Sequence, residues 1–257
     1  MLLAWLGTLC VVAALALRPR AAGAGTAAPR ESAVDLWEAE QAARARPWPP
    51  ELRALAGVVL VALGFGLSAF LPPGPAFALG TALAIHGYNV AIALALAPGP
   101  GWRRKLEVLG LVRPARAWLH FPIAFVAGFV LWWVALRATA LVPSTGESAI
   151  QVFVRMPSGL LSFASLAVVA PLAEEIFFRG FLYGVLEQRS KVLAFVVSAL
   201  LFAAAHGLQT FGQWGALVAI LVTGVALTAL RAVSRSALVP AVAHLVYNGL
   251  LAMGAFL

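Results

Sequence analysis

Two adjacent carboxylates, Glu174 and Glu175, lie inside an apolar stretch that runs from Pro171 to Gly180. Placing a charge at bilayer depth costs between ~2.5 and ~10 kcal/mol, depending on the reference state. An acidic pair at this depth therefore needs a partner and a chemical role. Arg179 follows Glu175 by four residues, which is the favourable order and spacing for an ion pair on one helix face. Glu174 is rotated ~100° around the helix axis, away from that arginine.

Three further polar side chains lie in two later apolar runs: His206 in one, and His244 with Asn248 in the other. With a rise of ~1.5 Å per helical residue, Glu174 and His206 lie ~20 Å from the expected inner ends of their helices. By the same rise, His244 and Asn248 lie ~12 and ~18 Å deep, and their spacing of four places them on one face. The sequence therefore predicts that four polar residues from three helices share one layer, in which Glu174 is available as a general base.

Simpler interpretations explain part of this set. The pair formed by Glu175 and Arg179 is equally well explained as a fold-stabilising contact, and a single histidine in a membrane helix is often an interhelical hydrogen-bond donor. Neither interpretation explains all of the residues together. His86 and Asn89 are three apart and have no neighbouring carboxylate, so a structural role is favoured for them. We expect packing or interfacial roles for four more residues, which are Phe177, Phe178, Phe202 and His120.

The composition defines the physical setting. The chain has 257 residues, of which 62% are hydrophobic and 11% are charged, and its mean hydropathy is +0.94. These values indicate a multispanning membrane protein and exclude an ordinary soluble domain. The formal net charge is +8, but the basic residues lie in short clusters between apolar runs, which argues against a nucleic-acid partner. Cys10 is the single cysteine, which excludes an internal disulfide and a cysteine metal cluster.

Apolar runs long enough, or nearly long enough, to cross ~30 Å of hydrocarbon recur along the chain. They predict an all-α, polytopic transmembrane helical bundle with about eight spans, at residues 2–17, 54–71, 76–97, 119–142, 157–186, 192–209, 214–230 and 236–256. We expect residues 1–17 to be a retained N-terminal anchor instead of a cleaved signal, because no lysine or arginine precedes the apolar run. The rest divides into three parts. We expect a cytoplasmic or interfacial linker at 18–53, two spans with a basic cytoplasmic loop at 54–114, and a core that holds the polar layer at 115–257.

The basic residues also predict an orientation. The segment 98–118 carries five lysine and arginine residues against the single acid Glu107, whereas the connector 71–75 carries no charge. By the positive-inside rule, this segment and the linker 18–53 are cytoplasmic, and both termini lie on the other side. The alanine, arginine and glycine bias favours a bacterial host, so the inner (plasma) membrane of a bacterium is the expected location.

At its polar residues the chain resembles the CAAX-protease and bacteriocin-processing family of intramembrane endopeptidases, which includes the Ras-converting CAAX endopeptidases. The family pattern is Glu-Glu-x-x-x-Arg, then Phe-x-x-x-His, then His-x-x-x-Asn. All three motifs occur here in order and without substitution, as Glu174-Glu175-Ile-Phe-Phe-Arg179, Phe202-Ala-Ala-Ala-His206 and His244-Leu-Val-Tyr-Asn248. The resemblance covers about residues 115–257.

The resemblance implies peptide-bond hydrolysis within the membrane. Glu174 would be the general base and later the proton donor, while the neighbouring acid and arginine would hold the helix and tune the site. His206 would orient the water or bind a metal. His244 and Asn248 would donate hydrogen bonds to the oxyanion of the tetrahedral intermediate.

A metal-dependent version of this protease is the main alternative. His206, His244 and either Glu174 or Glu175 could hold Zn²⁺ and leave one position open for water. Asparagine is a poor zinc ligand and a good oxyanion donor, and a metal would occupy the glutamate that the chemistry needs as a base unless Glu175 took its place. A glutamate mechanism without a cofactor is therefore favoured, with Zn²⁺ as the alternative.

The expected partners are the lipid bilayer and a substrate that is a peptide or a membrane protein, such as a prenylated protein or a leader peptide. Nothing in the sequence defines an oligomeric state. A proton-coupled transporter is a rival, since intramembrane Glu, His and Arg also form proton relays. That class favours matching repeats in both halves of the chain, whereas the polar groups here are concentrated in the second half. A non-catalytic membrane scaffold is the other rival, and the intact motifs argue against it.

Overall fold

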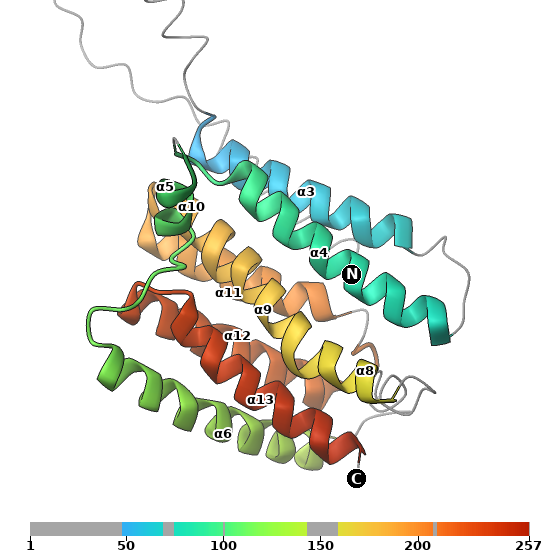
Figure 1. The fold of residues 1–257 in the computed structure, drawn as a ribbon. Coiled ribbons are helices and arrows are strands. Elements are labelled where there is room, and N and C mark those ends of the chain that lie inside the picture. Colours follow the sequence, from blue (N-terminus) through green and yellow to red (C-terminus); the bar gives the residue numbers. More distant parts are fainter. Residues whose placement is uncertain (1–47, 69–74, 100, 143–158, 208–209, 257) are drawn as a thin grey trace, which may run out of the picture.

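Figure 1 shows the fold in a computed structural model, which describes residues 48–68, 75–99, 101–142, 159–207 and 210–256. The regular elements in these ranges are all helices, which confirms the all-α prediction for this part of the chain. In chain order they are α3 Pro50–Ser68, α4 Pro75–Leu96, α5 Gly101–Val108, α6 Ala117–Leu141, α8 Gly159–Ala164, η1 Ser165–Val169, α9 Ala170–Glu174, η2 Glu175–Leu182, α10 Tyr183–Glu187, α11 Lys191–His206, α12 Trp214–Ser234 and α13 Leu238–Phe256.

Five helical stretches in the described ranges are long and apolar enough to cross a membrane: Pro50–Leu67, Leu79–Leu96, Ala117–Leu141, Leu161–Glu187 and Trp214–Ser234. Two apolar helices, Lys191–His206 and Leu238–Gly254, are shorter. The predicted number of about eight spans is therefore not confirmed. The first predicted span, 2–17, and most of the linker 18–53 lie outside the described residues.

Two boundaries differ from the expectation. The second span was expected from residue 54, but α3 already begins at Pro50, because a proline lacks an N–H and fits the first turn of a helix. The basic segment expected as a loop contains the helix α5. Gly184 lets α10 pack closely against α5, since a Cβ at this position would collide with the carbonyl oxygen of Val108.

The helices pack around two apolar clusters. Helices α3, α4, η2, α10 and α11 enclose one, which contains Phe181 and Leu201, and helices α6, α12 and α13 enclose the other, which contains Leu131 and Leu227. The continuous helical rod from α8 to α10 packs against α4 on one side and α13 on the other (Figure 1). This central position places the polar residues of the rod within reach of several helices.

The start of α3, the end of α4 and α5 lie at the same end of the bundle (Figure 1). Helix α5 carries Arg103, Arg104 and Lys105 there. Arg53 donates to the carbonyl of Leu96 at 3.1 Å, and Lys105 donates to the carbonyl of Leu94 at 2.8 Å. Trp102 of α5 is exposed at the same end, as is usual for aromatic residues at a membrane boundary. This is the end that the positive-inside rule assigns to the cytoplasm.

Candidate active site

The predicted acidic pair lies in a rod that is not a regular α-helix. The chain changes to π-helix at η1 and again at η2. In these turns an N–H bonds to the carbonyl five residues earlier, as Ala170 does to Ser165 and Tyr183 does to Phe178. Such turns are rare within α-helices and are frequent at functional sites.

Pro171 explains an unusual contact of this rod. Continuing the π-turn pattern, the N–H of residue 171 would bond to the carbonyl of Leu166, but proline has no N–H. The side chain of Asn248, on α13, supplies the donor instead, with its Nδ2 atom 3.1 Å from the Leu166 oxygen. An asparagine amide has two N–H groups, so this contact engages one of them.

A double-mutant cycle tests this explanation. Asn248→Ala should lower the free energy of unfolding by ~1 kcal/mol, because it leaves the partly buried Leu166 carbonyl without its donor. In a Pro171→Ala background the cost should be smaller, since the alanine introduced there can donate from its own backbone N–H. Unfolding in mild detergent, titrated with a denaturing detergent, measures both values. Equal costs in the two backgrounds would show that Asn248 does not replace the missing N–H.

Glu175 is buried, and with Arg179 it joins the rod to α12 and α13. Its Oε1 atom accepts a hydrogen bond from Nη1 of Arg179 at 2.8 Å and another from Nδ1 of His244 at 2.8 Å. Arg179 also donates from Nη2 to the carbonyl of Gly224 in α12 at 3.0 Å. The predicted ion pair is confirmed. The contact with His244 was not predicted, and it makes Glu175 the group that orients this imidazole.

The hydrogen bonds of the two imidazoles determine which nitrogen carries the proton. Nδ1 of His206 lies 2.8 Å from the carbonyl oxygen of Phe202; a carbonyl only accepts, so Nδ1 donates. Nδ1 of His244 donates to the carboxylate of Glu175. In both neutral rings Nε2 is then the nitrogen with a free lone pair.

Glu174 faces both of these Nε2 atoms. Its Oε1 atom lies 3.6 Å from Nε2 of His206, and its Oε2 atom lies 3.8 Å from Nε2 of His244. Both distances are longer than a direct hydrogen bond, and Glu174 Oε2 has no hydrogen-bond partner among the residues described. The Glu174 side chain is 13% exposed, against 1% for Glu175. The adjacent acids therefore differ: one is held in an ion pair, and the other faces two imidazoles.

The ring of Phe202 packs at the centre of these groups. Its centroid lies 4.7 Å from the imidazole of His206 and 5.7 Å from that of His244. The guanidinium of Arg179 lies 4.2 Å from the same centroid, and Phe178 contacts the ring edge-on at 5.4 Å. These contacts agree with the packing roles expected for both phenylalanines, and they restrict the orientation of the two imidazoles.

A cavity of about 270 Å³ lies beside Glu174 and His206. Its opposite wall comes from α3 and α4 and consists mainly of apolar side chains. His86 and Asn89 also line it, although a structural role was favoured for them, and within the described part of the chain His86 Nδ1 and Asn89 Oδ1 have no hydrogen-bond partner. The sequence signal that could have found them is a histidine inside a membrane span.

A zinc site in a protein needs three or four donor side chains around one point. Within the described ranges, no group of three histidine, cysteine, aspartate or glutamate side chains is arranged to hold one. Glu174 is the carboxylate that faces both imidazoles, so as a metal ligand it would lose its function as a base. The mechanism proposed for this site therefore uses protein groups and water.

Comparison with known proteins supports the same segment. A family model described as type II CAAX prenyl endopeptidase Rce1-like matches residues 156–250, which include the acidic pair, both site histidines and Asn248. Comparisons with curated proteins and with solved structures gave no match. Helices α3 to α6, which include one wall of the cavity, lie outside the matched segment. Residues 156–250 of this chain are thus similar to the Rce1-like type II CAAX prenyl endopeptidases.

Proposed function

We propose that this protein is an intramembrane endopeptidase in which Glu174 activates a water molecule for attack on a peptide carbonyl. The observation that carries the proposal is the convergence of Glu174, His206 and His244 beside a cavity between apolar helices. The family of residues 156–250 supports the reaction class. The observed geometry supports the proposed division of roles between the two acids.

The reaction begins with water held between the carboxylate of Glu174 and the Nε2 atom of His206. Glu174 takes a proton from this water while the water oxygen bonds to the carbonyl carbon of the substrate. The carbonyl oxygen then carries the negative charge of the tetrahedral intermediate. Glu174 returns the proton to the amide nitrogen as the C–N bond breaks, which releases an amine and a carboxylic acid.

The oxyanion is stabilised by His244 and Asn248 in this proposal. Nδ1–H of His244 is engaged with Glu175, so the ring donates from Nε2 only as an imidazolium, which the Glu175 carboxylate stabilises. Asn248 contributes its second N–H, because the first is bound to Leu166. Preorganised donors of this kind contribute ~3–4 kcal/mol of transition-state stabilisation each in other hydrolases.

The substrate class follows from the cavity and its surroundings. A predominantly apolar wall within a membrane protein suits a peptide that is lipid-modified or otherwise tethered to the bilayer. A prenylated C-terminal peptide is one such substrate, and a leader peptide of a membrane-associated precursor is another.

The test is cleavage of a farnesylated peptide and of its unmodified counterpart by purified protein in lipid nanodiscs, followed by mass spectrometry. Proton transport by the reconstituted protein with no cleavage of any peptide would contradict the proposal.

Narrowing the cavity beside Glu174 should weaken substrate binding while leaving Glu174 itself unchanged. Ala82→Phe places a ring in the cavity wall, and we expect it to lower kcat/KM by ~10-fold or more through lost substrate binding. Ala84→Phe is the matched control, because Ala84 is exposed on the same helix and is not part of the cavity lining. Equal kcat/KM values for the two variants would place the substrate elsewhere.

Metal removal separates the two mechanisms within this class. We expect cleavage to persist after treatment with 1,10-phenanthroline and dialysis, since Glu174 acts as the base without a metal ligand role. Elemental analysis of the active protein should then find less than one zinc per chain. Loss of activity on chelation, restored by added Zn²⁺ alone, would establish the metal-dependent alternative.

A further inference from the structure

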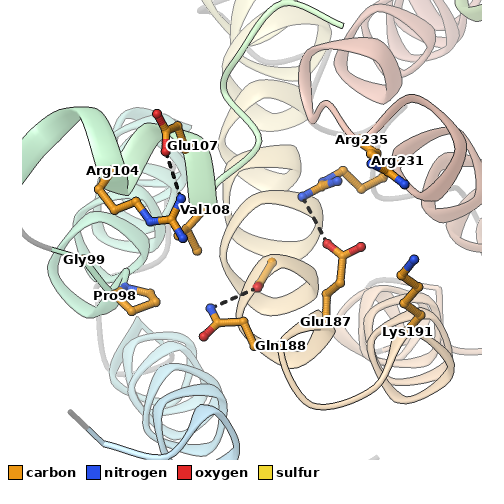
Figure 2. A pocket seen from close by; sticks show the side chains of 11 residues that line it. Pro98, Gly99, Arg104, Glu107, Val108, Glu187, Gln188, Lys191, Arg231 and Arg235 are labelled. Carbon is orange, nitrogen blue, oxygen red and sulfur yellow. Dashed lines mark hydrogen bonds and ion pairs between the residues drawn. The ribbon is translucent and has the colours of Figure 1, made fainter. Parts of the chain in front are cut away.

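A second cavity, of about 640 Å³, lies at the basic end of the bundle (Figure 2). It is bounded by α5, the end of α10, the start of α11 and the end of α12. Its charged lining consists of Arg104, Glu107, Glu187, Lys191, Arg231 and Arg235. Four cations and two anions give this lining a formal charge of +2 (4 − 2). The volume is in the range of ordinary ligand pockets, which is roughly 300–1,000 Å³.

The acids in this cavity are already paired with part of the positive charge. Glu107 pairs with Arg104 at 2.9 Å, and Glu187 lies 3.8 Å from Nη2 of Arg231. Neither Lys191 nor Arg235 has an acidic partner among the residues that the structure describes. Figure 2 shows both of them on the side of the cavity opposite Arg104. The surplus of positive charge therefore belongs to these two side chains.

The backbone of Arg235 is a second, independent observation. This residue ends α12 in the left-handed conformation, with φ of 56°. Glycine or asparagine is usual at such a position, because a larger side chain is strained there. The inner cation is also fixed: Nε of Arg231 donates to the carbonyl of Arg179 at 3.0 Å, and its guanidinium lies 4.9 Å from the ring centroid of Tyr183. The cavity is thus lined by one fixed cation, Arg231, and by two exposed cations, Lys191 and Arg235.

We propose that this cavity binds a phosphate group, and its level in the membrane makes an anionic phospholipid headgroup the expected source. The cavity lies between helix ends at the side predicted to be cytoplasmic, next to α5 with its exposed Trp102. Basic pockets between membrane helices at this level bind anionic headgroups. Free phosphate has the same chemistry, so the experiment distinguishes the two sources.

The test measures binding to purified, delipidated protein by native mass spectrometry and by fluorescence titration. The probes are phosphatidylglycerol, phosphatidylcholine and inorganic phosphate. The pocket variant is Lys191→Gln with Arg235→Asn, in which asparagine tolerates the left-handed backbone. The matched control is Arg113→Gln with Arg116→Gln, which removes two exposed basic residues of the same end that do not line the cavity. Thermal unfolding verifies that both variants are folded.

We expect the pocket variant to bind phosphatidylglycerol ~30-fold more weakly than the wild type, because each basic side chain near an anionic lipid contributes about a fivefold factor. The control variant should bind it nearly as well as the wild type. If inorganic phosphate binds as tightly as the lipid and the pocket variant weakens its binding equally, the phosphate site is supported and its ligand is a soluble one. Equal losses in both variants, or no loss in either, would overturn the proposal. No readout here depends on peptide cleavage, so the result is independent of the proposed protease activity.

Discussion

Glu174→Gln should reduce peptide cleavage by ~10²- to 10⁴-fold while the protein keeps its fold. Glutamine has nearly the same shape but cannot accept the proton of the attacking water. Within the described ranges the Glu174 carboxylate makes no direct hydrogen bond, and the two imidazole nitrogens lie 3.6 and 3.8 Å away. The loss of its charge should therefore cost little stability. Single-turnover cleavage in nanodiscs gives the rate, and thermal unfolding gives the stability.

Glu51→Gln provides the matched control for this loss of one acid. Glu51 lies in the first turn of α3 and pairs with Arg189 at 3.0 Å, away from the cavity beside Glu174. This variant should retain the wild-type rate. Full cleavage by the Glu174→Gln protein would reject Glu174 as the base. An unfolded Glu174→Gln protein would show that this acid has a structural role.

Arg179→Met is expected to have the largest effect on stability, lowering the free energy of unfolding by ~3–5 kcal/mol. The substitution keeps an unbranched apolar side chain but leaves the Glu175 carboxylate buried at 1% exposure without its cation. It also removes the hydrogen bond to the Gly224 carbonyl of α12. Denaturing-detergent titration of the purified protein measures the change.

Two further variants separate charge from packing. Arg104→Met breaks a pair with Glu107 that is 60% and 46% exposed, and exposed pairs of this kind contribute only ~0–1 kcal/mol. Combining Arg179→Met with Glu175→Gln should recover part of the stability, because no unpaired charge remains buried. A single Arg179→Met variant as stable as Arg104→Met would show that the buried pair does not hold the rod in place.

The sequence was sufficient to predict contacts that depend on spacing within a helix. Four residues separate Glu175 from Arg179, and the side chains meet as this spacing predicts. The apolar runs likewise predicted the helices, apart from the ends near Pro50 and the short α5. Helical rise also placed Glu174 and His206 at similar depth, and the structure brings these side chains within 3.6 Å.

Contacts that depend on the rotation of one helix against another were not predictable from a single sequence. The bond from His244 to Glu175 requires a particular rotation of α13 against the rod. The π-turns have no periodic signature, and only the missing N–H of Pro171 indicates a local irregularity. His86 needed the position of α4, because nothing in its own span places it beside the acid 88 residues later.

The wall of the cavity beside Glu174 comes from α3 and α4, outside the segment that matches the family model. In the proposed enzyme, the acid and its imidazoles therefore belong to one stretch of the gene, and the surface that selects the substrate belongs to another. Mutations in the first half can alter which peptide is accepted while the hydrolytic groups stay unchanged. A chimaera that takes α3 and α4 from a relative should accordingly inherit the peptide preference of the donor.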